Sequence, residues 1–316
     1  MFKIKAHEFK DIKGWINSKP LSIKKLKGKI ILLDFWTYSC INCLRTLPHL
    51  KEIYEKYKDK NFILIGVHTP EFDFERKLDN VKKAVKNLKI KYPIAVDSNN
   101  VTWKLYGNRY WPKQALIDNN GNVIYKHVGE GGYNEIEENI VKLLKEINVN
   151  VEFKRKKEIK FMPTFLVSPE TYAGHLRNNW IGNGKLCIPG SCNYYEDPNE
   201  YKLNVIYLDG NWIQEDEFLK HYDNKLGKII FKYIGHSING VLVPDKNNFE
   251  VVVKLDNKYL TKENVGKDVK FKGKVSYVKV DKPQLYELTK TKNIESHVLT
   301  LETKSKDFKL YAFTFG

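Results

Sequence analysis

The feature that most constrains the fold is a change of hydrophobic period near residue 149. Before it, short apolar runs alternate with helical patterns, and after it β-rich runs recur about every ten residues. A chain of 316 residues is long enough for two domains of ordinary size. The charged segment 149–163 has no clear period. We therefore predict domains at 1–148 and 164–316, joined by a linker at 149–163.

Strands and helices alternate in the first half of the chain. Ile30–Trp36 is apolar except for Asp34, as expected of a strand buried on both faces, and residues 62–67 form a second such run. Helical spacing of apolar residues predicts helices after Ile30–Trp36, over 74–88 and over 136–147, and shorter runs predict strands at 94–96, 115–118 and 123–128. Asn120-Gly121 is a hairpin signal. The alternation predicts an α/β domain with a mixed sheet.

The second half contains few helical signatures. We expect strands at 203–208, 228–234, 240–243, 249–255, 269–280, 284–288, 297–303 and 308–315. In several of them lysines alternate with apolar residues, which is typical of strands with one exposed face. Strands at this spacing predict an all-β sandwich of jelly-roll type.

The net charge of +16 raises the question of a nucleic-acid partner. Five of the 54 basic residues are Arg, so 54 − 5 = 49 are Lys, and they are spread along the whole chain. Proteins that read nucleic acids tend to gather Arg and Lys on one face. The dispersed lysines favour an ordinary solvated surface, and we predict no nucleic-acid partner.

The chain has no stretch that predicts membrane insertion or export. No apolar run approaches the ~18 residues that span a bilayer. The first ten residues, MFKIKAHEFK, lack the apolar stretch of a secretory signal. These features predict a cytoplasmic protein.

The cysteine pair Cys40-Ile41-Asn42-Cys43 carries the clearest chemical signal. It follows a buried strand and begins the next predicted helix, where free backbone N–H groups and the helix dipole stabilise a thiolate. Two intervening residues allow both sulfurs to meet within one turn. Cys40, on the solvent side, is the predicted nucleophile, and Cys43 would resolve the mixed disulfide.

The segment ILLDFWTYSCINCLRTLPHL resembles the active site of the thioredoxin superfamily, in particular the TlpA-like branch fused to the membrane protein DipZ. Three further segments support this in the first half: VHTPEF at 67–72, YGNRYWP at 106–112 and ALID at 115–118. SPETYAG at 168–174 and FTFG at 313–316 resemble the β-sandwich that follows the thioredoxin fold in DipZ-like proteins. The resemblance covers nearly the whole chain and implies a protein-disulfide oxidoreductase.

The resemblance also implies roles for residues around the two cysteines. Asp34 matches the buried acid of thioredoxins, which would exchange a proton with Cys43; an Asp that only caps a loop is the alternative. Pro112 matches the cis-proline facing the disulfide, where the backbone of Trp111 would meet a client. Pro48 matches the proline that kinks the active-site helix, and Trp36 is expected to pack beneath the site.

The predicted cofactors and partners follow from this chemistry. No organic cofactor or metal is expected, because the redox centre is the Cys40–Cys43 disulfide itself. Protein thiols and disulfides are the expected clients, and a reductase or a CcdA- or DipZ-like membrane electron carrier is the expected donor. The direction of electron flow stays open, because the Ile41-Asn42 insert differs from the Gly-Pro of ordinary thioredoxins.

A second cysteine pair, Cys187 and Cys192, flanks the turn dipeptide Pro189-Gly190. The alternatives for this pair are a structural disulfide, two free thiols, a second redox pair, or a zinc site shared with the first pair. The rival function is a carbohydrate- or partner-binding adaptor with a structural or vestigial CxxC pair. Its sugar platform would consist of aromatic residues of the second half, which otherwise fill a core: Trp180, Tyr194, Tyr195 and Trp212.

Overall fold

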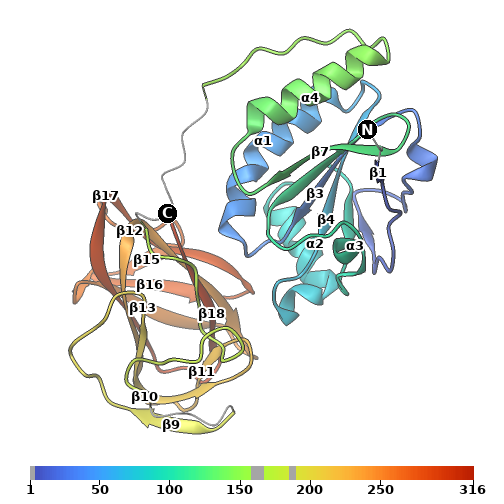
Figure 1. Cartoon of the computed structure of the whole chain (residues 1–316). Helices are drawn as coiled ribbons and strands as arrows, with labels where there is room; N and C mark the ends of the chain where they lie inside the picture. The colour runs from blue at the N-terminus through green and yellow to red at the C-terminus, as the bar shows by residue number, and fades with distance from the viewer. Residues whose placement is uncertain (1–3, 158–166, 185–189) are drawn as a thin grey trace. The chain divides into compact units, whose positions relative to one another are not determined.

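The computed structural model describes residues 4–157, 167–184 and 190–316 and divides into two compact units (Figure 1). The first unit comprises Met1–Phe161 and the second Met162–Gly316. Among the described residues, no helix is both long and apolar enough to span a bilayer. Each unit has its own sheet and its own core and is described separately.

The first unit is built on a seven-stranded mixed sheet in the order β1-β7-β6-β3-β4-β5-β2. Strands β3, β4 and β5 are parallel, and the others run antiparallel to their neighbours. The strands are β1 (Ile4–Lys5), β2 (Trp15–Ile16), β3 (Ile30–Trp36), β4 (Phe62–His68), β5 (Ile94–Val96), β6 (Lys113–Ile117) and β7 (Asn122–Val128). The helices are η1 (Lys24–Leu26), α1 (Ile41–Tyr57), η2 (Asp73–Arg76), α2 (Leu78–Asn87), α3 (Val101–Leu105) and α4 (Tyr133–Glu146). The predicted mixed sheet and its β6–β7 hairpin are confirmed.

The central strand β3 is buried on both faces, as its apolar sequence predicted. One face, with Leu33 and Phe35, packs on Trp103 of α3. Because side chains alternate along a strand, Asp34 and Trp36 point to the opposite face. Helices α1 and α4 run side by side (Figure 1) and are joined by Tyr57, which donates a 2.7 Å hydrogen bond to Glu137.

The predicted helix over 74–88 is interrupted. Lys77 has extended backbone angles (φ −75°, ψ 115°), which separate η2 from α2. The apolar spacing continues across the break because Phe74, Val81 and Val85 are all buried. The short elements β1, β2, η1 and α3 were not predicted, since a few residues carry too little periodicity to identify.

Part of the segment predicted as a linker packs on the first unit. Val151 is buried, and the main-chain N–H of Lys156 donates to the side chain of Asn134 at the start of α4. Arg155 forms an ion pair with Glu138 of the same helix. Residues 149–157 therefore lie along α4, and residues 158–163 of the predicted linker fall outside the described residues.

Within its described residues, the second unit is all-β and contains one eleven-stranded sheet, which confirms the predicted class. The first half of β12 pairs with β10, and its second half pairs with β18, while β17 follows it along most of its length. Bulges near Gly235 and Ile238 mark the change of partner. The strands are β8 (Thr171–Tyr172), β9 (Cys192–Tyr195), β10 (Ile206–Gln214), β11 (Leu219–His221), β12 (Gly227–Pro244), β13 (Phe249–Leu255), β14 (Lys258–Tyr259), β15 (Val269–Lys272), β16 (Val275–Val280), β17 (Gln284–Thr303) and β18 (Phe308–Phe315).

Several strand boundaries differ from the prediction. The runs at 228–234 and 240–243 belong to the single strand β12, and those at 284–288 and 297–303 belong to β17. Polar residues between the runs stay in the sheet because each long strand supplies the other's hydrogen bonds. Conversely, the run at 269–280 is a hairpin with its turn at Gly273, whose φ of +61° favours glycine.

Gly66 of β4 generates a stability prediction for the first unit. An added Cβ would lie 2.5 Å from Ile94 Cδ1 and 2.9 Å from Trp36 Nε1. We expect Gly66→Ala to lower the free energy of unfolding by about 1–3 kcal/mol, because this core is already filled. Amide hydrogen exchange of β3 and β4 in the full chain measures this unit separately. Gly14→Ala, which meets only the Leu78 side chain, is the milder control, and equal protection in both variants would contradict the prediction.

Candidate active site

The two cysteines lie where β3 gives way to α1. Cys40 is the N-cap of the helix, with extended backbone angles, and its sulfur accepts a 3.4 Å hydrogen bond from the main-chain N–H of Cys43. Cys40 is partly exposed, whereas Cys43 is 2% exposed. Both are free thiols in this structure. The strand-to-helix junction thus presents one accessible sulfur at the helix N-terminus, above a buried one.

The surroundings of Cys43 oppose its ionisation. Burial raises the pKa of Cys43 well above its usual value, and the hydrogen bond and charge of Cys40 raise it further. A backbone hydrogen bond from Thr37 acts in the opposite direction and stabilises the thiolate. Of the two sulfurs, Cys40 is therefore the one open to attack a partner, and Cys43 requires a group that accepts its proton.

Asp34 places its carboxyl group on the face of β3 that also carries Trp36. It is 1% exposed and accepts a 2.9 Å hydrogen bond from Gln114 Nε2 on the neighbouring strand β6. Burial raises the pKa of Asp34 to about 7, and the Gln114 hydrogen bond only partly offsets this. The Asp34 charge also raises the pKa of Cys43, which shows that the two groups interact. Asp34 can therefore change its protonation near neutral pH.

The Trp111–Pro112 peptide bond is cis, as the family resemblance implied. The carbonyl of Pro112 accepts a 2.9 Å hydrogen bond from the main-chain N–H of Gly129, which follows β7. The ring of Trp111 stacks on that of Trp103 in α3, with ring centroids 4.3 Å apart. The contact of Trp111 and Pro112 with a client stays a prediction.

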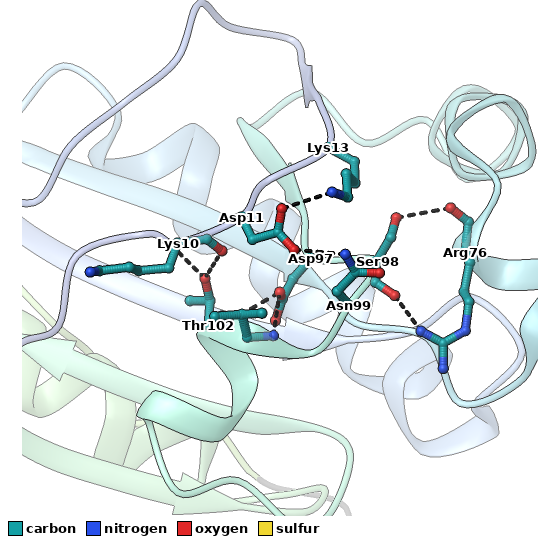
Figure 2. A network of polar contacts seen from close by, with 9 residues as sticks. Lys10, Asp11, Lys13, Arg76, Asp97, Ser98, Asn99 and Thr102 are labelled. Atoms are coloured by element: carbon teal, nitrogen blue, oxygen red, sulfur yellow. Dashed lines mark hydrogen bonds and ion pairs between the residues drawn. The ribbon is translucent and has the colours of Figure 1, made fainter.

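A buried acid at the end of β5 supports α3 and therefore Trp103. Asp97 accepts hydrogen bonds from the main-chain N–H groups of Val101, Thr102 and Trp103, between 2.7 and 3.2 Å. Figure 2 shows Asp97 beside Thr102 within a wider polar network; in that network Arg76 donates to the carbonyl of Ser98. Asp97 thus acts as an N-terminal cap that fixes the short helix beneath Trp111.

A third buried acid, Glu75, lies under the loop that leads to Cys40. It is fully buried, and Thr37 and Ser39 donate to its Oε1. His68, also fully buried, lies 3.3 Å from the Thr37 hydroxyl through Nε2, and burial lowers the pKa of His68 to about 3. Sequence reasoning missed Glu75, although it sits next to Phe74 on an apolar helical face, where an acid is unusual.

The remaining residues singled out in the sequence either pack in the first unit or lie outside the described residues. Trp36 is fully buried against His68, with ring centroids 5.4 Å apart, which agrees with packing beneath the site. Pro48 lies inside α1. Cys187 and the side chain of Cys192 lie outside the described residues. Among the residues described, no three His, Cys, Asp or Glu side chains are grouped to hold a metal ion.

The four aromatic residues suggested as a sugar platform separate into two sets. Tyr195 and Trp212 are 4% and 1% exposed and belong to the core of the second unit, which confirms the expectation that such residues fill a core and excludes both from a surface platform. They point inward because side chains alternate along β9 and β10. Trp180 and Tyr194 are exposed, at 52% and 66%.

Comparison with known proteins identifies both halves of the chain. The model described as Redoxin matches residues 5–144, and the model described as Thioredoxin like C-terminal domain matches residues 168–316. Protein DipZ of Mycobacterium bovis is 41% identical over 213 residues, which make up 66% of this chain. The match covers 30% of DipZ, so the chain spans less than a third of that relative.

Two further relatives match a smaller part of this chain. Thiol-disulfide oxidoreductase ResA of Bacillus thuringiensis is 34% identical over 128 residues, which are 40% of this chain and 71% of ResA. The crystal structure of the exposed lipoprotein thioredoxin Etrx1 of Streptococcus pneumoniae is 28% identical, covers 43% of this chain and all of its own, and has a TM-score of 0.39.

The two family models and ResA agree with the resemblance seen in the sequence of both halves. The length of ResA that is covered, together with the two family models, establishes the relationship at the level of the family. The chain therefore belongs to the thioredoxin superfamily as a DipZ- and TlpA-like protein.

Proposed function

We propose that this protein exchanges a Cys40–Cys43 dithiol or disulfide with the thiols and disulfides of client proteins. The observation that carries the proposal is the partly exposed Cys40 sulfur at the N-cap of α1, bonded to the N–H of the buried Cys43. The helix N-terminus favours the Cys40 thiolate, and the one-turn spacing lets Cys43 reach it. The name of ResA, thiol-disulfide oxidoreductase, supports the same chemistry.

In the reducing direction, the Cys40 thiolate attacks one sulfur of a client disulfide. A Cys40–client disulfide forms, and the other client sulfur leaves as a thiolate. Cys43 then gives its proton to Asp34 and attacks Cys40, which forms the Cys40–Cys43 disulfide and releases the second client thiolate. Two electrons have passed to the client, and a protein dithiol must return them. In the opposite direction the same steps oxidise a client.

Substitution of each cysteine gives a different expected result. Cys40→Ser should abolish the catalysed reduction of insulin by dithiothreitol, because the CxxC pair then lacks its accessible sulfur. Cys43→Ser keeps the attacking sulfur and should accumulate a mixed disulfide with the client, visible on a non-reducing gel. The two variants control for each other, since each removes one thiol from the same turn. Insulin reduction by Cys40→Ser at the wild-type rate would refute the proposal.

Asp34 links stability to pH. In the folded chain its pKa is about 7, raised from 3.8. The contribution of protonated Asp34 to the free energy of unfolding is therefore complete below pH 3.8 and is lost as the pH rises through 7. We expect Asp34→Asn to be more stable than wild type at pH 8, by about 2–4 kcal/mol, and the difference to vanish near pH 4. Urea denaturation at both pH values measures this.

The same variant should lack the proton acceptor for Cys43. Release of a client from the mixed disulfide should therefore slow at pH 7 and lose its inflection near that pH. Asp79→Asn, at an exposed position of α2, is the matched control and should change neither property. A stability difference that does not depend on pH would contradict the role of Asp34.

One observation favours carbohydrate binding by the second unit as a second candidate function. Tyr194 of β9 pairs with Asn211 of β10, and Tyr222, which follows β11, donates its main-chain N–H to the Asn211 carbonyl. Both tyrosines are exposed, at 66% and 56%. Two strand spacings place them about 10 Å apart. Between them, Asn211 donates a 2.7 Å hydrogen bond to Asp223. Flat rings beside polar groups are suited to stack on sugar rings.

The full chain should then sediment with one of three insoluble glycans: cellulose, chitin or peptidoglycan. Replacement of Tyr194 and Tyr222 together by Ala should reduce the bound fraction at least tenfold, about 1.4 kcal/mol. Tyr259→Ala, at an exposed tyrosine of β14 in the same unit, should bind as wild type does. No sedimentation of the wild-type chain with any of the three would end this candidate.

A further inference from the structure

Gln114 of β6 is the side chain that bonds the carboxyl group of Asp34. In the register of the sheet, Asp34 lies opposite Gly66 of β4 on one side and opposite Gln114 on the other. Paired residues share a face and Gly66 has no side chain, so Gln114 faces the acid along this row. Its Nε2 donates a 2.9 Å hydrogen bond to Asp34 Oδ1. Both residues are 1% exposed, so bulk solvent does not reach the pair.

Titratable side chains from three other segments lie around this pair. Burial raises the pKa of Cys43, in α1, and of Tyr92, just before β5, and the charge of Asp34 raises both further. His127 of β7 lies opposite Gln114 in register, on the side away from Asp34. Among the described residues, the hydrogen bond to the Asp34 side chain comes from Gln114 alone. The direct contact of the acid is thus an uncharged amide.

The amide of Gln114 offers both kinds of hydrogen-bonding group to one carboxyl. Its NH₂ group donates to a carboxylate, and its carbonyl oxygen accepts from the O–H of a neutral carboxyl. Gln114 Oε1 is buried and has no hydrogen-bond partner among the described residues. A half-turn about the last side-chain bond exchanges the places of Oε1 and Nε2. A lysine or arginine at this position could only donate, and it would favour the carboxylate alone.

We propose that Gln114 is a positioning residue for proton exchange: its amide holds the Asp34 carboxyl both with and without its proton. This rests on the proposed thiol–disulfide exchange, in which Cys43 gives a proton to Asp34. Once protonated, Asp34 donates through its new O–H to Gln114 Oε1, where the carboxylate had accepted from Nε2. Burial raises the pKa of Asp34 to about 7, and the Gln114 hydrogen bond lowers it only in part. The pair therefore binds and releases a proton near neutral pH without repacking the core.

Titration of Asp34 in the full chain tests the contact directly. Aspartate labelled with ¹³C at its side-chain carboxyl is incorporated, and the Asp34 signal is identified by its loss in Asp34→Asn. Gln114→Met keeps a long, unbranched side chain and removes both the donor and the acceptor. We expect the titration midpoint of Asp34 to rise by about one pH unit in this variant, because the lost hydrogen bond favours the charged form. In the wild-type chain, the ¹⁵N signal of the Gln114 NH₂ group should change with the same midpoint as Asp34.

The kinetics of exchange give a second readout. Reduced protein is mixed with an excess of a chromogenic aromatic disulfide, 5,5′-dithiobis(2-nitrobenzoate), and release of the coloured thiol is recorded by stopped flow. Attack by Cys40 releases the first thiol, and attack by Cys43 on the resulting mixed disulfide releases the second. Cys43→Ser identifies the first phase, and a variant without either cysteine gives the background. We expect the pH inflection of the second phase to rise in Gln114→Met by the same amount as the midpoint of Asp34.

Leu116→Met is the matched control. Leu116 lies two residues along β6, so it shares the face of Gln114, and it is fully buried. This variant introduces the same side chain into the same strand, and it should change neither the Asp34 midpoint nor the inflection.

An unchanged or lowered Asp34 midpoint in Gln114→Met would overturn the proposal, as would an equal effect of Leu116→Met or a midpoint that moves without the inflection. A wild-type Gln114 ¹⁵N signal that does not change with pH would also overturn it, and this measurement applies even if Gln114→Met folds poorly. If the wild-type chain lacked a second phase, the proposed exchange would fail and this role with it. The NMR midpoints distinguish that failure from a failure of the contact between Gln114 and Asp34.

Discussion

The chemistry of this protein depends on a strand-to-helix junction that puts two sulfurs at different depths. The N–H of Cys43 is one of the four that a helix leaves without a partner in its first turn, and it bonds to the Cys40 sulfur. The Cys40 sulfur therefore lies at the helix N-terminus, while burial raises the pKa of Cys43, one turn deeper. A dithiol of this kind can attack through one sulfur and resolve through the other without moving the backbone.

Three buried acids of the first unit have three different environments. Asp97 accepts main-chain N–H groups and fixes α3, and Glu75 accepts five donors and joins two loops. Asp34 has a single hydrogen bond, from Gln114. Burial of a carboxyl group costs free energy that hydrogen bonds can offset. Burial raises the pKa of both Asp34 and Glu75 to about 7, so the number of donors alone does not set their ionisation. Asp34 is the acid whose charge acts on Cys43.

The second unit shows how one strand can serve two parts of a sheet. β12 changes neighbour from β10 to β18 at its bulges, and the long β17 remains beside it. The same alternation that buries Trp212 and Tyr195 turns Asn211 and Tyr194 outward. An exposed surface and a core are thus built from adjacent residues of the same strands, which is why aromatic composition alone does not separate the buried pair from the exposed pair.

The amino-acid sequence by itself determined the α/β and all-β halves, the strand before Cys40, the helix after it and the cis bond before Pro112. These depend on hydrophobic period, on residue spacing and on a motif, all of which are local. Only the tertiary structure decided the contacts of the buried Glu75, the single long strands β12 and β17 and the placement of Tyr222 beside Asn211. Each of these depends on partners far away in the chain, such as Thr37 for Glu75, and spacing along the sequence carries no record of such contacts.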